Sequence, residues 1–143
     1  MLQNLVAGSG LVALSVLIHA IGLIAIGTAM SFLAHRLGLH NHIVGRTVVM
    51  TAIVMGILGL LTLEVWSWAF AYDLLDATDS FADSLYLSTA MFSTIGYGDM
   101  VFDPAWRLLT ALEGINGFIM IGWSTAFLVR ASTQHGPFKD KDF

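Results

Sequence analysis

The run Thr94-Ile95-Gly96-Tyr97-Gly98-Asp99 gathers small and polar residues in a chain that is 57% apolar. Gly96 and Gly98 allow backbone angles that other residues resist. Successive carbonyl groups can therefore turn toward the same side, with the side chains of Ile95 and Tyr97 packed behind them. Copies of this run around a symmetry axis would surround a dehydrated cation with rings of carbonyl oxygen atoms.

The elements that must position this run are membrane helices. Charged residues make up 11% of the chain, against about 25% in soluble proteins, and the mean hydropathy is +0.79. Residues 5–34 and 47–63 contain no Asp, Glu, Lys or Arg, and residues 105–129 contain only Arg107 and Glu113. Because about 20 apolar residues cross a bilayer, the sequence predicts an all-α membrane protein with three transmembrane helices.

The first apolar stretch also has features of a signal peptide. It lacks a basic segment before the apolar run and is longer than a signal-peptide core, so a retained helix is the favoured interpretation. The chain has no cysteine, which excludes disulfides and thiolate metal sites.

Charge is segregated along the chain. Arg36 and Arg46 lie in a short segment without acidic residues, and Lys139 and Lys141 lie in the C-terminal tail. Six aspartates and no Lys or Arg lie between residues 73 and 103. By the positive-inside rule, we expect a multi-pass protein of the cell membrane with its N-terminus outside and its C-terminus in the cytoplasm. An outer aromatic belt is expected from Trp66, Trp68, Tyr72 and Trp106.

A short helix is predicted over residues 81–92. Ser80, followed three residues later by Asp83, fits a capping box at its start. This helix would be about 18 Å long, too short for a hydrocarbon core of about 30 Å. It must enter the membrane and return, which places the following loop at membrane depth, where non-helical backbone must be buried in protein or line a watery path.

At these residues the sequence resembles the potassium channel family, whose filter signature is T-x-G-Y-G-D. The resemblance covers residues 47–131, read as an outer helix, a re-entrant pore helix (81–92), a filter (94–99) and an inner helix (105–130). An extra N-terminal helix (1–35) and a cytoplasmic loop (36–46) precede this module, and a short cytoplasmic tail (132–143) follows it. The resemblance implies a homotetramer that conducts K⁺ passively and selectively.

The resemblance also implies roles for individual filter residues. Ion coordination falls to the carbonyl groups of Thr94, Ile95, Gly96 and Tyr97 and to the Thr94 hydroxyl. Filter support falls to Ser93, Gly98 and Asp99, the last as a hydrogen-bonding brace behind the outer mouth. Ser93 and Ile95 stand where many relatives have threonine and valine. Ala90 stands where some relatives place a glutamate bonded to the aspartate, so the partner of Asp99 is open.

The last helix is expected to line the inner cavity and to carry the gate. The residues assigned to this face are Gly117, Phe118, Ile121, Thr125 and Val129. Gly117 falls where the family often has a gating glycine, but close helix packing is the alternative for Gly117 as for Gly114 and Gly122. Asn116 is expected to form a hydrogen bond between helices.

No arginine ladder of a voltage sensor is present, and the predicted tail is too short for a ligand-sensing domain. Gating is therefore expected to be intrinsic to the membrane part or to respond to lipid, protons, tension or a separate regulatory partner. The sequence predicts neither an enzyme nor a nucleic-acid partner.

Other classes remain open. His35, His40 and His42 form either a metal site or, by the favoured interpretation, a solvated loop, because their spacing is irregular and no carboxylate accompanies them. A histidine-ligated haem or electron-transfer protein would rely on His19. A non-conducting or weakly selective channel-like subunit and a transporter subunit are further alternatives.

His19 and Glu64 are predicted to lie at similar depth. His19 precedes Arg36 by 17 residues and Glu64 follows Arg46 by 18, so antiparallel helices would carry both about 26 Å from the arginines. An intramembrane ionisable residue is costly unless it is paired. The two could share a proton and tie the first helix to the pore module; alternatively each has its own partner, with Glu113 a competitor in the last helix.

Overall fold

The computed structural model describes residues 2–38, 42–99 and 104–135 of the 143-residue chain. These residues form helices α1 (Leu2–Arg36), α2 (Ile43–Leu74), α3 (Phe81–Phe92) and α4 (Arg107–His135), with a short 3₁₀ helix, η2 (Pro104–Trp106), before α4. No strand occurs in these described ranges. The all-α prediction is confirmed.

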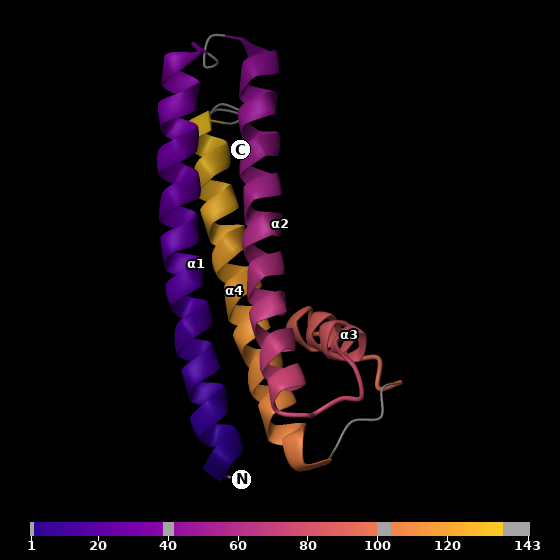
Figure 1. Cartoon of the computed structure of the whole chain (residues 1–143). Helices are drawn as coiled ribbons and strands as arrows, with labels where there is room; N and C mark the ends of the chain where they lie inside the picture. Colours follow the sequence, from indigo (N-terminus) through magenta and orange to yellow (C-terminus); the bar gives the residue numbers. More distant parts are fainter. Residues whose placement is uncertain (1, 39–41, 100–103, 136–143) are drawn as a thin grey trace.

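The three long helices lie side by side, and α3 packs beside one end of them (Figure 1). Helices α1 and α4 run in the same direction, and α2 runs against both. Each of the three is long and apolar enough to cross a membrane. With 35 residues, α1 extends about 52 Å, so it projects beyond a hydrocarbon core of about 30 Å.

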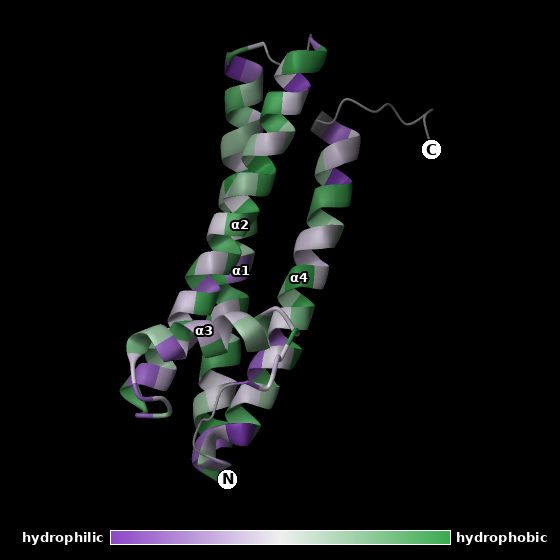
Figure 2. Cartoon of the chain, turned by 90° about the vertical axis from the view of Figure 1, so that its right-hand side faces the viewer, coloured by the Kyte–Doolittle hydropathy of each residue, from purple (hydrophilic) through white to green (hydrophobic). Residues whose placement is uncertain are grey.

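Apolar residues cover the long helices on several sides, and polar residues gather mainly at the two ends and around α3 (Figure 2). Buried apolar side chains form two clusters. The first joins α1, α2 and α4 at the end that bears Arg36, Arg46 and Arg130, and it contains Leu23, Ala34, Val49, Ile53, Ile57, Leu60 and Ala131. The second surrounds α3 and contains Trp68, Tyr72, Ala77, Leu87, Phe92, Leu109 and Met120.

Helix α3 has the predicted bounds of 81–92 and the predicted start. Ser80 has extended backbone angles, and its Oγ accepts a hydrogen bond of 3.2 Å from the backbone N–H of Asp83. The hydroxyl of Ser80 also donates to the Asp83 carboxylate at 2.7 Å. The first of these contacts satisfies the backbone N–H of Asp83, which would otherwise be free in the first turn.

Two helix boundaries differ from the sequence prediction. Helix α2 begins at Ile43, inside the range 36–46 that the sequence predicts as a loop, and α4 continues to His135, beyond the predicted end at residue 130. A formed helix gains one hydrogen bond for each residue that it adds, so it continues past the apolar stretch until a helix-breaking residue stops it.

Candidate functional site: an exposed glycine-containing loop and its supports

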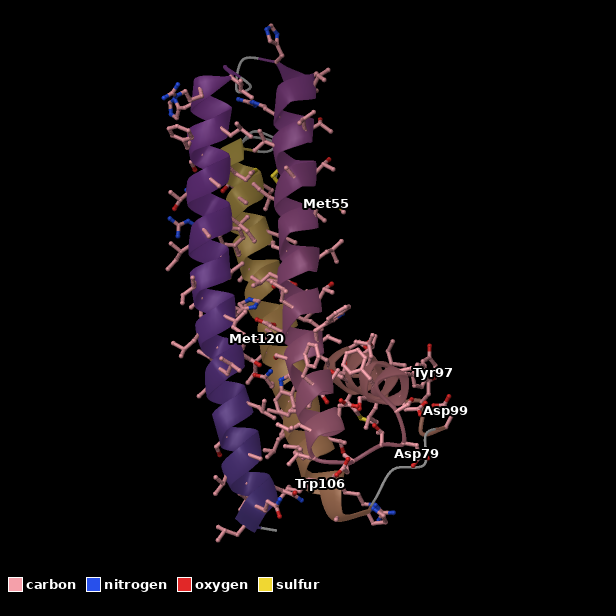
Figure 3. The ribbon with its side chains drawn as sticks, viewed as in Figure 1. Met55, Asp79, Tyr97, Asp99, Trp106 and Met120 are labelled. Carbon is pink, nitrogen blue, oxygen red and sulfur yellow. The ribbon has the colours of Figure 1, made fainter. Side chains whose placement is uncertain are left out.

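The loop that follows α3 faces away from the helical core. Residues Thr94–Asp99 are all exposed in the single chain, and the side chains of Ile95 and Tyr97 are 57% and 69% exposed. Figure 3 shows Tyr97 and Asp99 beyond α3, on the side far from α1. Exposed apolar patches of this kind mark sites of contact with another protein or with a membrane.

The loop begins with a hydrogen-bonded helix end. The N–H of Ile95 donates to the carbonyl of Ala90 at 3.1 Å, and the N–H of Thr94 donates to the carbonyl of Met91 at 2.9 Å. This pair of bonds is a Schellman motif, which needs a left-handed residue just past the helix. Thr94 takes that position with φ of 62°, although a β-branched residue there is a conformational outlier.

Backbone angles alternate along the loop. Thr94, Gly96 and Gly98 have φ of 62°, 52° and 71°, and the intervening Ile95 and Tyr97 do not have positive φ. Alternation of this kind gathers successive peptide groups on one side of the chain, whereas a strand presents them alternately on both sides. The glycines occupy two of the three positions that need a left-handed conformation.

Asp99 is held by a residue that sequence reasoning missed. The hydroxyl of Tyr86, on α3, donates a hydrogen bond of 2.8 Å to Oδ2 of Asp99. This bond raises the pKa of the Tyr86 hydroxyl above an ordinary value of about 10, which already keeps the hydroxyl protonated as a donor at neutral pH. Ala90 is buried and supplies only backbone carbonyl bonds here. Tyr86, and not residue 90, is therefore the side chain of α3 that contacts Asp99.

A buried carboxylate supports the inner side of α3. Glu113, on α4, accepts a hydrogen bond of 2.5 Å from the hydroxyl of Tyr72 on α2 and one of 2.6 Å from the hydroxyl of Ser88 on α3. Ser88 also contacts the carbonyl of Val65 at 2.9 Å. Glu113 thus joins three helices around the loop. Sequence reasoning treats Glu113 as a competitor in the Glu64 network and finds neither hydroxyl partner.

Gly117 brings α4 against the end of α3. A Cβ atom added at Gly117 would overlap the carbonyl oxygen of Phe92 and lie 2.7 Å from its carbonyl carbon. Backbone atoms cannot move aside as a flexible side chain can. The structure therefore gives Gly117 a close-packing role directly behind the loop, while its gating role stays a prediction.

The structure brings part of the predicted cavity face to the loop. A pocket of about 430 Å³ is lined by Thr94 and Gly96 of the loop and by Thr110, Gly114 and Phe118 of α4, among others. Phe118 is 70% exposed. Further along α4, the predicted cavity residues Ile121, Thr125 and Val129 are not buried in the single chain.

His19 and Glu64 meet in the centre of the helices. Nδ1 of His19 lies 2.9 Å from Oε1 of Glu64, and Nε2 lies 3.3 Å from the hydroxyl of Ser124. Both side chains of the pair are fully buried. The histidine thereby links α1 to α2 and α4. Both ring nitrogens of His19 thus have side-chain partners within the chain.

Other polar residues remain outside these networks. Asn116 is buried, and neither of its side-chain polar atoms has a partner within the described ranges, so the predicted interhelical bond is not observed there. His40 lies outside the described residues. Within the ranges that the structure covers, no group of three or more His, Cys, Asp or Glu residues could hold a metal ion.

Comparison with known proteins identifies the family. A family model described as an ion channel matches residues 58–134, which is just over half of the 143 residues. The match includes α3, the loop and most of α4. No curated protein and no solved structure matches the chain. The chain therefore belongs to the ion channel family and is a multi-pass membrane protein.

Proposed function

We propose that copies of this chain form a K⁺-selective pore. Carbonyl oxygens of Thr94, Ile95, Gly96 and Tyr97, with the Thr94 hydroxyl, replace the hydration shell of the ion. Ser93 ends α3 just before the loop, and Gly98 allows the left-handed backbone that the loop needs. Asp99 braces the outer end of the loop. K⁺ is the transported ion.

The observation that carries this proposal is the alternating backbone of the loop. Positive φ at residues 94, 96 and 98 supports carbonyl groups gathered on one side, which is what a multi-oxygen cation site needs. The T-I-G-Y-G-D sequence supports K⁺ over other cations.

A ring of four copies is proposed because one loop supplies only one wall of a cation site. The exposed side chains of Ile95, Tyr97 and Phe118 favour contacts between copies. The end that bears Arg36, Arg46 and Arg130 is proposed to be cytoplasmic by the positive-inside rule.

The proposal can be tested with purified protein in phosphatidylcholine vesicles. Vesicles loaded with K⁺ and diluted into Na⁺ should develop a K⁺ diffusion potential, which a voltage-sensitive dye reports. Vesicles without protein should develop this potential only when a K⁺ ionophore is added. A membrane equally permeable to Na⁺ would contradict K⁺ selectivity. Native mass spectrometry should show a tetramer, and a stable monomer or dimer that carries flux would contradict the ring of four.

A further inference from the structure

A second hollow lies between α1 and α4, away from the loop. This α1–α4 pocket has a volume of about 830 Å³. Its lining begins at Ala20 and Trp123, near the middle of α1 and α4. It continues past Gly27 and Phe127 to Arg130, near the C-terminal end of α4. The walls between these ends are largely apolar, with Leu23, Ile24 and Phe32 among the lining residues.

The pocket lies on the opposite side of α4 from the proposed ion path. Phe127, which lines the pocket, follows Phe118 by nine residues, and nine residues rotate a helix by about 180° beyond complete turns. The face of α4 that carries Phe118 can therefore line an ion path while the Phe127 face turns toward α1 and the surrounding membrane.

The dimensions of the pocket match one leaflet of a bilayer. Ala20 and His35, both in its lining, are separated by 15 residues of α1, which corresponds to about 22 Å. One leaflet contributes about 15 Å of hydrocarbon, so the lining reaches from mid-membrane to the headgroup region.

The positive charge of Arg130, at one end of the pocket, favours an anionic occupant. Arg130 is exposed and makes no ion pair within the described residues. In the tail, Lys139 and Lys141 balance Asp140 and Asp142, so the tail supplies no excess of acidic side chains. Basic pockets between transmembrane helices bind the headgroups of anionic lipids.

We propose that the α1–α4 pocket binds an anionic phospholipid, with one acyl chain along Gly27 and Phe127 and the headgroup at Arg130. The extra helix α1 then has a definite role, since it supplies one wall of a lipid site beside α4. The inference concerns binding, and it can fail or hold independently of K⁺ conduction.

Tryptophan quenching tests the proposal with the whole chain. The protein is placed in phosphatidylcholine vesicles that contain a minor fraction of either dibrominated phosphatidylglycerol or dibrominated phosphatidylcholine. The signal of Trp123 is the difference between the wild type and Trp123→Phe. Arg130 follows Trp123 by seven residues, or about 10 Å along the helix, so bromines in the middle of an acyl chain lie at the depth of Trp123.

Brominated phosphatidylglycerol is expected to quench Trp123 at several-fold lower concentration than brominated phosphatidylcholine. Arg130→Gln should reduce this preference by about fivefold. Arg46→Gln makes the same charge change at the same end outside the pocket and should leave the preference unchanged. Equal quenching by both lipids in the wild type, or equal effects of the two substitutions, would overturn the proposal.

A steric variant gives a second test. Gly27→Phe places a ring in the pocket, where a Cβ would already lie 3.5 Å from the Phe127 ring, and it should reduce quenching by both lipids. Gly10→Phe is the matched control, because a Cβ at Gly10 meets no atom within 4 Å. If neither lipid quenches Trp123 in the wild type, a second copy or another segment fills the pocket and the lipid site does not exist.

Discussion

Two buried carboxylates, Glu113 and Glu64, are supported in different ways. Glu113 accepts hydrogen bonds at both oxygens, from Tyr72 and Ser88. Glu64 contacts His19 through one oxygen, while its Oε2 has no partner in the described part of the chain. A fully satisfied buried network holds its members in one arrangement, and a partly satisfied one is less restrictive.

The two carboxylates connect different helices. Glu113 connects α3, which carries the loop, to α2 and α4. Glu64 is bonded to the extra helix α1 through His19. The helix that precedes the loop therefore rests on a carboxylate with both oxygens bonded, whereas α1 is joined through a carboxylate with one bonded oxygen within the described residues. Substitutions in the Glu113 network should therefore destabilise the assembly more than substitutions at the His19 and Glu64 contact.

Glu113→Ala should have the largest effect. It leaves the buried hydroxyl of Tyr72 without an acceptor, which costs about 1–3 kcal/mol. Ser88 loses one of its two acceptors and keeps the carbonyl of Val65. We expect the thermal stability of the detergent-solubilised assembly to fall strongly and K⁺ flux to be lost with it. Glu113→Gln keeps one acceptor oxygen and should be milder. Wild-type stability in Glu113→Ala would show that Glu113 does not support α3.

Gly117→Ala should have the second-largest effect on the stability of the assembly. Its Cβ would overlap the Phe92 carbonyl oxygen, and overpacking of this kind costs about 1–3 kcal/mol. Both thermal stability and K⁺ flux should fall, whereas Gly122→Ala, whose Cβ meets no atom within 4 Å, should retain thermal stability. A hinge role predicts the opposite pattern for Gly117→Ala, with unchanged stability and altered open probability in single-channel recordings.

The support of α3 can be predicted only in part from sequence. Ser80 and Asp83 are three residues apart, so local spacing is enough to place the start of α3. Tyr72 and Ser88 are 41 and 25 residues from Glu113. Their meeting depends on how three helices pack, and helical periodicity does not report it.

The His19 and Glu64 contact shows which long-range pairs are accessible to sequence reasoning. Both residues can be counted from arginines at the same membrane face, so the sequence alone predicts that they lie at comparable depth. Depth does not give rotation about the helix axis, and sequence reasoning therefore misses Ser124 as the second partner of His19. Tyr86 carries no such signal, because its bond to Asp99 depends on the path of the loop.

Breaking the His19 and Glu64 contact should cost less than breaking the Glu113 network. Hydrogen bonds between membrane helices couple by about 0.6 kcal/mol on average and up to about 1.7 kcal/mol. His19→Ala and Glu64→Gln should each lower thermal stability modestly or change the pH dependence of K⁺ flux. The double variant should be no worse than the worse single variant. Additive losses would show that the two side chains act independently.

Tyr86→Phe should have a small effect on stability, because the bond to Asp99 lies at an exposed position. We expect a modest loss of K⁺ over Na⁺ selectivity in the vesicle assay, matched by Asp99→Asn. If Asp99→Asn changes selectivity and Tyr86→Phe leaves it at the wild-type value, another group braces Asp99.

Gly96→Ala tests the central claim that the alternating backbone of the loop conducts the ion. A Cβ at residue 96 would meet no atom within 4 Å, but its φ of 52° is unfavourable for any residue with a side chain, by about 1–2 kcal/mol. The loop should change conformation and turn a carbonyl away, so K⁺ flux should stop while native mass spectrometry still shows tetramers. Gly59→Ala, which also meets no atom within 4 Å and has no positive φ, should conduct as the wild type does. Normal K⁺ flux through Gly96→Ala in the same vesicles would contradict the assignment of the loop as the ion-coordinating site.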